Sequence, residues 1–285
     1  MQRLKTKDMA GHQCLVDVFF HQQASYWAEL YEREGIQEAI HQERLRAALA
    51  MVDTLQLLPE ARVLDVGGGA GYATVALASR GFMVDALDPL RVMVDTTRNR
   101  AIEAGVNSRV ATRIGDVHAI PSSDDAFELV LALGVLPWLP EASKPLREMA
   151  RVIRPGGHLI VSVDNLWQLR HFLDPLRSPL LGRPRRLMGD ILRAWGWLPP
   201  RVRSQLTSLR TFRQLLAAEG FEELHGVALG FGPFTFFNRE ILPRSASLKL
   251  QHWLQSLANR GSPILRSHGS QHLVLEQKRV VTGNT

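Results

Sequence analysis

Short apolar runs alternate with segments of helical periodicity between residues 62 and 163. The runs are rich in β-branched and aliphatic residues, and the first of them ends in glycines, which is typical of buried strands. Strands are predicted over 62–66, 82–87, 109–114, 127–133 and 158–163, with a turn over 155–157, and helices over 72–80, 90–104 and 141–153. Strands that alternate with helices need crossover connections, so the pattern predicts a mostly parallel sheet covered on both faces.

The rest of the chain departs from this rhythm at both ends. Residues 17–57 have helical spacing of apolar positions, and Pro59 closes that region. A helix over 209–219 and strands over 221–229 and 272–277 resume the sheet pattern, with a further helix predicted over 247–259. We therefore predict one structural domain, an α/β doubly wound seven-stranded fold, with four parts: an N-terminal helical lid (1–60), a cofactor-binding core (61–165), a basic helical insertion (166–208), and the end of the sheet with a Phe-rich, helical insertion within 231–270 (209–285).

A glycine-rich segment, Asp65-Val66-Gly67-Gly68-Gly69-Ala70-Gly71, joins the first predicted strand to the first helix. Glycines at such a turn let the backbone approach a ligand at the positive end of a helix. A dinucleotide-binding turn has the spacing G-x-G-x-x-G. Counting from Gly67 places Tyr72 where the third glycine should be, so that reading is disfavoured.

The D-x-G-x-G-x-G pattern resembles the first motif of class I methyltransferases that use S-adenosylmethionine. Later segments match the same family in order: Asp88 at the end of the second strand, Gly115-Asp116-Val117 followed by Ile120-Pro121, the Leu133-Gly134-Val135-Leu136 segment, and Leu146 to Gly157. The resemblance covers about residues 60–165 and is greatest to small-molecule enzymes of the ubiquinone and menaquinone type. Where many relatives carry a His-His pair, this chain has Pro137-Trp138.

The resemblance implies S-adenosylmethionine as cofactor and a set of residues that bind it. The glycine turn is expected to hold the methionine part, Asp88 the ribose hydroxyls and Asp116 the adenine amino group. The cofactor-binding residues expected on this basis are Asp65, Gly67, Gly69, Gly71, Asp88, Pro89, Asp116, Val117, Leu133 and Tyr26.

Methyl transfer from a sulfonium is an in-line displacement, so the protein mainly positions the acceptor and excludes water. A base is needed only when the acceptor carries a proton of high pKa, and the sequence does not show whether one is used. Ligands of open parallel sheets bind beyond the carboxyl ends of the strands. The residues expected near the acceptor are Trp138, Asp164 and Asn165, together with His171 and the phenylalanines Phe234 and Phe236 of the late insertion. No spacing of the histidines indicates a metal site.

Positive charge is concentrated in residues 166–213, which hold ten Arg, no Lys and two acids in a chain of net charge +6. Such a block is compatible with an anionic substrate, a membrane surface, nucleic acid or a solvated face. Apolar positions between 185 and 198 share one helical face, as in a membrane-surface helix, although lid or core packing is favoured. A single cysteine and no apparent leader or apolar span favour the cytoplasm.

The sequence therefore predicts methyl transfer from S-adenosylmethionine to a small molecule with an apolar body and an anionic end. Three alternatives stay open: action on nucleic acid, action on a membrane lipid through the Arg-rich segment, and a nicotinamide-dependent oxidoreductase. The Arg block lacks regularly spaced aromatic residues for base stacking, so nucleic acid is disfavoured. The acceptor's identity and the oligomeric state are left undetermined.

Overall fold

The fold is described from a computed structural model, in which residues 15, 16, 18–182, 184, 187, 188, 191, 195 and 204–280 are described. Seven strands form the main path of one sheet, in the order β3-β2-β1-β4-β5-β10-β7. The strands of this path span Arg62–Val66 (β1), Met83–Asp88 (β2), Val110–Ile114 (β3), Phe127–Ala132 (β4), Ile153–Asn165 (β5), Phe221–Leu229 (β7) and Gln271–Lys278 (β10). The first five are mutually parallel, and β10 runs antiparallel to both of its neighbours. The predicted fold class is confirmed, with a two-residue strand β6 (Leu206–Thr207) added beside β5.

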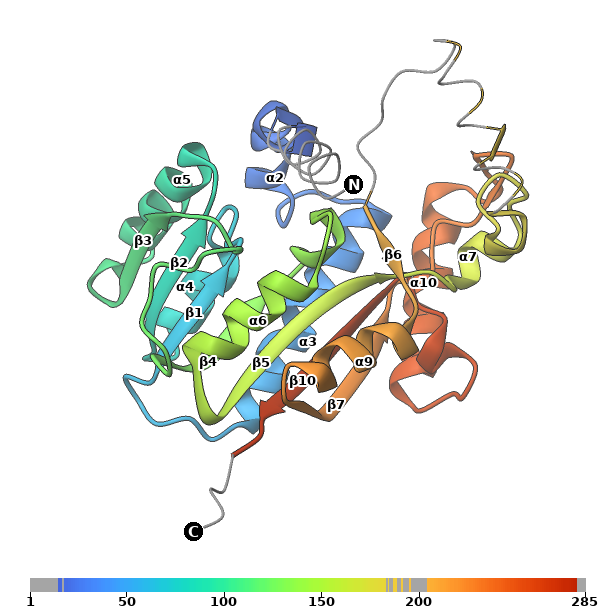
Figure 1. The fold of residues 1–285 in the computed structure, drawn as a ribbon. Coiled ribbons are helices and arrows are strands. Elements are labelled where there is room, and N and C mark those ends of the chain that lie inside the picture. The colour runs from blue at the N-terminus through green and yellow to red at the C-terminus, as the bar shows by residue number, and fades with distance from the viewer. Residues whose placement is uncertain are drawn as a thin grey trace.

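Helices cover both faces of the sheet (Figure 1). On one face, α3 (Ile36–Thr54) and α4 (Tyr72–Ala78) share an apolar core with the strands, and α5 (Arg91–Glu103) packs beside α4. On the other face, α6 (Ser143–Val152) and α9 (Leu209–Ala218) bury their apolar stripes in a second core. The central strands β1 and β4 are buried on both faces, which is why they read as continuous apolar runs.

The N-terminal region differs from the predicted lid over residues 1–60. Helical residues 18–22 and helix α2 (Ala24–Glu29) lie over the end of the sheet, but a break at residues 30–35 separates them from α3. Helix α3 is part of the core, because Ala48, Met51 and Val52 pack beneath the sheet. Among the described residues, only those between 18 and 34 are placed as a lid.

The predicted turn at Pro155-Gly156-Gly157 lies inside β5, which is longer than the predicted strand. Pairing with β4 shifts register there, because Phe127 aligns with Ile153 and Leu129 with His158. Gly156 has a φ of 77°, which lets the bulged chain re-enter the ladder.

The two late insertions pack on each other at one end of the sheet (Figure 1). The first contains α7 (Leu169–Phe172) and a 3-10 turn at Pro179–Leu181. The second contains the hairpin β8 (Thr235–Phe236) and β9 (Arg239–Glu240), and helix α10 (Arg244–Asn259), which coincides with the helix predicted over 247–259. A small separate core joins them, formed by Phe231, Leu254, Ala258 and Leu265 with Leu169 against it. Among the described helices, none is long and apolar enough to cross a membrane.

Candidate active site

A cavity of about 490 Å³ lies at the carboxyl ends of β1, β2, β4 and β5. Its walls include Asp65 and the glycine turn after β1, Asp88 at the end of β2, Leu133 after β4 and Asp164 near the end of β5. The order of the strands reverses between β1 and β4, and this is where open α/β sheets bind ligands.

The glycine turn has the backbone that its sequence predicts. Gly67, Gly69 and Gly71 have φ values of 63°, 54° and 82°, which L-residues with side chains rarely adopt. A Cβ on Gly69 would have the Gly67 carbonyl oxygen at 3.9 Å as its nearest neighbour, so the turn is open on the cavity side. A Cβ on Gly71 would come within 2.9 Å of Thr97 on α5. Gly71 therefore serves helix packing and lies outside the cavity wall, contrary to its expected place in the cofactor site.

Two carboxylates, those of Asp65 and Asp88, lie beside the glycine turn. The Asp65 side chain is buried and accepts a 2.6 Å hydrogen bond from the Thr74 hydroxyl. Burial, with a smaller contribution from the negative charge of Asp88, raises the pKa of Asp65 to about 6. The Asp88 carboxylate accepts hydrogen bonds from the backbone N–H groups of Gly69, at 3.1 Å, and Leu90, at 2.9 Å. Asp88 thus fixes the glycine turn and the backbone just before α5 while its carboxylate lines the cavity.

The lid is fastened to the glycine turn by Tyr72 and Arg100. The Tyr72 hydroxyl donates to the Ala28 carbonyl at 3.1 Å and to Glu32 at 2.7 Å. The Arg100 guanidinium stacks over the Tyr72 ring and donates to the carbonyls of Ala28 and Ala70. The tyrosine that replaces the third glycine of a dinucleotide turn therefore holds α2 over the cavity.

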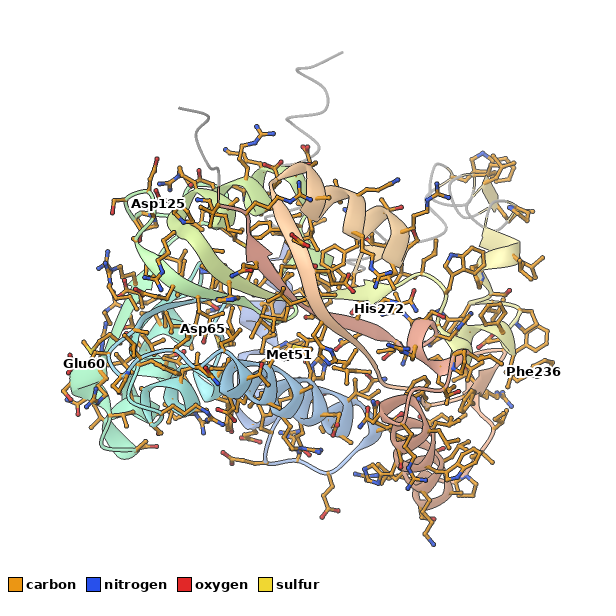
Figure 2. The ribbon with its side chains drawn as sticks, turned by 90° about the horizontal axis from the view of Figure 1, so that it is seen from below. Met51, Glu60, Asp65, Asp125, Phe236 and His272 are labelled. Carbon is orange, nitrogen blue, oxygen red and sulfur yellow. The ribbon has the colours of Figure 1, made fainter. Side chains whose placement is uncertain are left out.

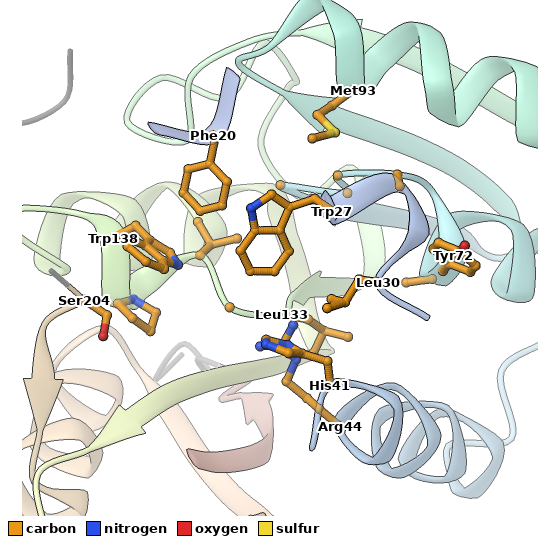
Figure 3. Close-up of a pocket in the computed structure, with 18 of the residues that line it drawn as sticks. Phe20, Trp27, Leu30, His41, Arg44, Tyr72, Met93, Leu133, Trp138 and Ser204 are labelled. Atoms are coloured by element: carbon orange, nitrogen blue, oxygen red, sulfur yellow. The ribbon is translucent and has the colours of Figure 1, made fainter. Parts of the chain in front are cut away.

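Aromatic side chains from the lid meet Trp138 across the cavity (Figure 3). Trp138 stacks on Phe19, with ring centroids 5.5 Å apart, and contacts Phe20 edge-on at 5.0 Å. Phe20 in turn contacts Trp27 at 5.4 Å. Trp138, predicted near the acceptor, is thus part of an apolar wall, and Tyr26 lines the same cavity while its hydroxyl donates to Glu38.

Arg44 is a cavity residue that the sequence analysis did not identify. It is 5% exposed and lies on the buried stripe of α3 with Ile40, Ala48 and Met51. Its guanidinium lies against Gly134, since a Cβ there would be 2.6 Å from one of the terminal nitrogens. Its Nε has no hydrogen-bond partner. The signal was present in the sequence as a charge at helical spacing within an apolar face.

The far end of the cavity is polar. Asp164 lines it and accepts a 3.3 Å hydrogen bond from Gln271 and another from Ser204. Burial raises the pKa of Asp164, while the positive charges of Arg44 and Arg170 oppose that rise. Arg170, on α7, reaches into the same wall and donates to the Gly232 carbonyl at 3.0 Å.

Four residues predicted beside the acceptor lie outside the cavity wall. The Asn165 side chain makes structural hydrogen bonds: it donates to the carbonyls of Ser267 and Gly269 and accepts from the Trp167 N–H. His171 is buried on α7, away from the lining. Phe234 packs on the small core of the insertions, and Phe236 is half exposed at the edge of the molecule, far from Asp65 (Figure 2). The structure places neither phenylalanine in the wall of this cavity, because the second insertion builds its own core.

The expected adenine residues are also outside the lining. The Asp116 carboxylate is 66% exposed and accepts from the His118 backbone N–H at 2.9 Å and pairs with its ring. Val117 is buried in the core between the sheet and α6. Asp65, Gly67, Gly69, Asp88, Pro89, Leu133, Tyr26, Trp138 and Asp164 are the predicted site residues that the structure brings together.

Two expectations concern regions that the structure covers incompletely. Within the described part of the chain, no group of three or more His, Cys, Asp or Glu side chains is placed to hold a metal. Most of the Arg block lies outside the described residues: Arg183, Arg185, Arg186, Arg193, Arg201 and Arg203. Of the rest, Arg170 is in the cavity wall and Arg213 pairs with Glu223.

Comparison with known proteins supports the resemblance to methyltransferases. Residues 64–161 match a family described as the methyltransferase domain. The chain is 31% identical over 138 residues to methyltransferase GfsG of Streptomyces halstedii, covering 48% of each protein. It is 38% identical over 109 residues to demethylmenaquinone methyltransferase of Mycolicibacterium gilvum, covering 38% of this chain and 44% of that protein. The matched segments thus span less than half the length of these relatives.

The fold comparison extends further along the chain. The structure of magnesium protoporphyrin IX methyltransferase from Synechocystis PCC 6803 superimposes with a TM-score of 0.62 at 17% identity, covering 94% of this chain and 99% of that one. The predicted resemblance is confirmed: residues 64–161 match the methyltransferase-domain family, and the chain has the fold of class I S-adenosylmethionine-dependent methyltransferases.

Proposed function

We propose that the chain transfers a methyl group from S-adenosylmethionine to a small-molecule acceptor. The observation that carries this proposal is one cavity that brings together the open glycine turn, the Asp88 carboxylate and the buried Arg44 guanidinium. The structure of magnesium protoporphyrin IX methyltransferase was determined with bound S-adenosylhomocysteine, which supports the same cofactor here.

The polar groups of the cavity fit such a cofactor. The Asp88 carboxylate lines the cavity at the end of β2, where a carboxylate can accept hydrogen bonds from ribose hydroxyls. The space in front of Gly69 accommodates the chain of the methionine part. The Arg44 guanidinium, buried and lacking a partner at Nε, supplies the bidentate donor that a carboxylate requires. These residues hold a molecule with a ribose at one end and a carboxylate at the other.

The bound cofactor would supply an activated methyl group, and residues of the chain would exclude water, position the acceptor and accept its proton. Phe20, Trp27 and Trp138 exclude water and position an apolar acceptor for in-line attack. Asp164 lies at the polar end of the cavity, with a pKa raised by burial. We propose that its carboxylate accepts the proton of an acceptor hydroxyl or amine.

The acceptor is proposed to have an apolar body and an anionic or hydrogen-bonding end. The wall is aromatic around Trp138 and carries Arg170, Ser204 and Gln271 at the far end. A cavity of about 490 Å³ is in the usual range for small-molecule sites. Nicotinamide chemistry gains no support, because Tyr72 ties the lid to the turn where a third glycine would stand. We also propose a cytoplasmic location, supported only by the single cysteine.

Transfer of a labelled methyl group tests this function. The protein is incubated with methyl-labelled S-adenosylmethionine and fractionated extract from the source cells, and label is counted separately in small molecules, lipids, protein and nucleic acid. We expect label in a small-molecule or lipid fraction, and none with Gly69→Val. Label confined to nucleic acid or protein would contradict the proposed acceptor class, and no transfer to any fraction would contradict the proposed activity.

A further inference from the structure

Exposed apolar side chains gather where the two insertions meet. Leu173, Leu176 and Leu180 project from the first insertion, with Leu180 71% exposed. Phe236 and Phe237, 50% and 55% exposed, project from the β8–β9 hairpin of the second. We call these five side chains the apolar rim.

The apolar rim is held together by a buried carboxylate. Asp174 accepts hydrogen bonds from the Thr235 hydroxyl, at 2.6 Å, and from the Asn238 N–H, at 2.9 Å. Arg177 donates to the Asn238 side chain at 2.8 Å. These bonds tie residues 173–177 to the hairpin, so the leucines and phenylalanines are fixed as neighbours. Soluble proteins seldom keep large apolar side chains in such a group on a solvated surface unless something binds there.

Further apolar side chains are exposed on the first insertion. Leu187, Met188, Ile191 and Trp195 are also exposed among the described residues. The same stretch of chain, residues 166–213, holds ten Arg against two acids, and one of those acids is Asp174, which is buried by its hydrogen bonds. Arg177 and Arg239 are exposed beside the rim, with Glu240 of opposite sign on the hairpin. Leucine and aromatic side chains beside arginines are the composition of surfaces that bind anionic membranes.

The rim is connected to the cavity through the chain. The first insertion begins after β5 and ends just before β6, and Asp164 and Ser204, near its two ends, both line the cavity. Arg170, four residues before Asp174, lines it too, and its bond to Gly232 joins the second insertion. The surface that carries the rim thus flanks the acceptor end of the cavity, at the end of the sheet marked by α7 and α10 (Figure 1).

We propose that the apolar rim docks on an anionic membrane surface, from which the cavity receives a lipid-soluble acceptor. The choice of acceptor rests on the proposed methyl transfer, whereas docking does not. Charge complementarity favours an anionic membrane over a second copy of this chain, because the exposed Arg177 and Arg239 flank the rim and two copies would bring these like charges together. The rim side chains enter the interface, and the arginines meet the lipid headgroups.

Vesicle flotation with the full chain tests docking. The vesicles are pure phosphatidylcholine, or phosphatidylcholine with phosphatidylglycerol, at low and high salt. We expect binding to the anionic vesicles that weakens with salt, and about tenfold weaker binding for Leu180→Ser and for Phe236→Ser, since each loses a buried apolar side chain. The matched control is Leu58→Ser, a 77% exposed leucine before β1, which should bind as the wild type does.

The outcomes separate docking from the proposed function. The docking proposal would be overturned if the wild-type protein did not bind anionic vesicles. It would also be overturned if Leu58→Ser lost as much vesicle binding as Leu180→Ser does. A concentration-dependent dimer in sedimentation that Leu180→Ser abolishes would overturn it too, because it would assign the rim to a second copy. Vesicle binding by a protein that binds no S-adenosylmethionine would leave docking supported and contradict the proposed function alone. With docking supported, labelled methyl found only in water-soluble acceptors would overturn the lipid-soluble acceptor.

Discussion

Replacing Arg44 by Met should have two effects: weaker cofactor binding and a higher free energy of unfolding. Arg44 is 5% exposed on the core-facing stripe of α3, and its Nε has no partner. Burying a guanidinium that is incompletely paired costs several kcal/mol, partly offset here by the negative charge of Asp164. Methionine fills the same space without the charge, so the free energy of unfolding should rise by about 1–2 kcal/mol.

Binding should change in the opposite direction. A bidentate bond between Arg44 and a carboxylate contributes about 3 kcal/mol, which corresponds to about a hundredfold in Kd. Calorimetric titration with S-adenosylhomocysteine measures this loss. Titration with methylthioadenosine, which has the same nucleoside and thioether but no carboxylate, should show almost no change. The control is Arg46→Met, since Arg46 is an exposed residue two positions further along α3 that pairs with Glu43.

Two results would refute this reasoning. If Arg44→Met weakens the binding of S-adenosylhomocysteine and of methylthioadenosine equally, the arginine shapes the cavity as a whole and does not bind the carboxylate. If the variant melts below the wild type and keeps its affinity, Arg44 is a structural residue whose charge is compensated in the native protein.

Three further outcomes follow from the same geometry. Asp88→Ala should lower the affinity for S-adenosylhomocysteine at least tenfold, because ribose hydroxyls lose a charged acceptor; an unchanged Kd in a folded variant, checked by circular dichroism, would show that Asp88 only fixes the backbone around it. Gly69→Val should abolish binding, since its φ of 54° disfavours a side chain and valine would fill the open space that the cofactor needs, while the secondary structure stays intact; retained binding would place the ligand elsewhere. Glu276 is buried with its pKa raised to about 7, so its neutral form is favoured in the fold and stability falls as the pH rises through 7. Glu276→Gln should remove that loss, worth about 1–2 kcal/mol after allowance for partial solvation, in urea unfolding at pH 8.5 but not at pH 5; equal differences at both pH values would contradict it.

The sequence predicted the sheet well because the central strands β1 and β4 are buried on both faces. Strand β1 matches its predicted bounds, as does β7, and Asp65, Gly69 and Asp88 share the predicted cavity. These features depend on local pattern and on the rule that ligands bind at the carboxyl ends of parallel strands. Local information was sufficient there.

The acceptor side was predicted less well because it depends on contacts between distant segments. Phe234 was expected in the pocket from composition, yet it packs against a core that α10 supplies. Asn165 lies at the carboxyl end of β5, but its amide donates hydrogen bonds to the loop before β10. Arg44 was missed because a single charge on a helix is ordinarily assigned to a solvated face, and only the tertiary structure shows that this stripe faces the cavity.

Calorimetric titration of the full chain with S-adenosylmethionine tests the central claim most directly. The account predicts one site per chain with a micromolar Kd, competition by S-adenosylhomocysteine, and no binding heat in Gly69→Val. Absence of binding to both ligands by folded protein, or tight binding of NADH in their place, would contradict it.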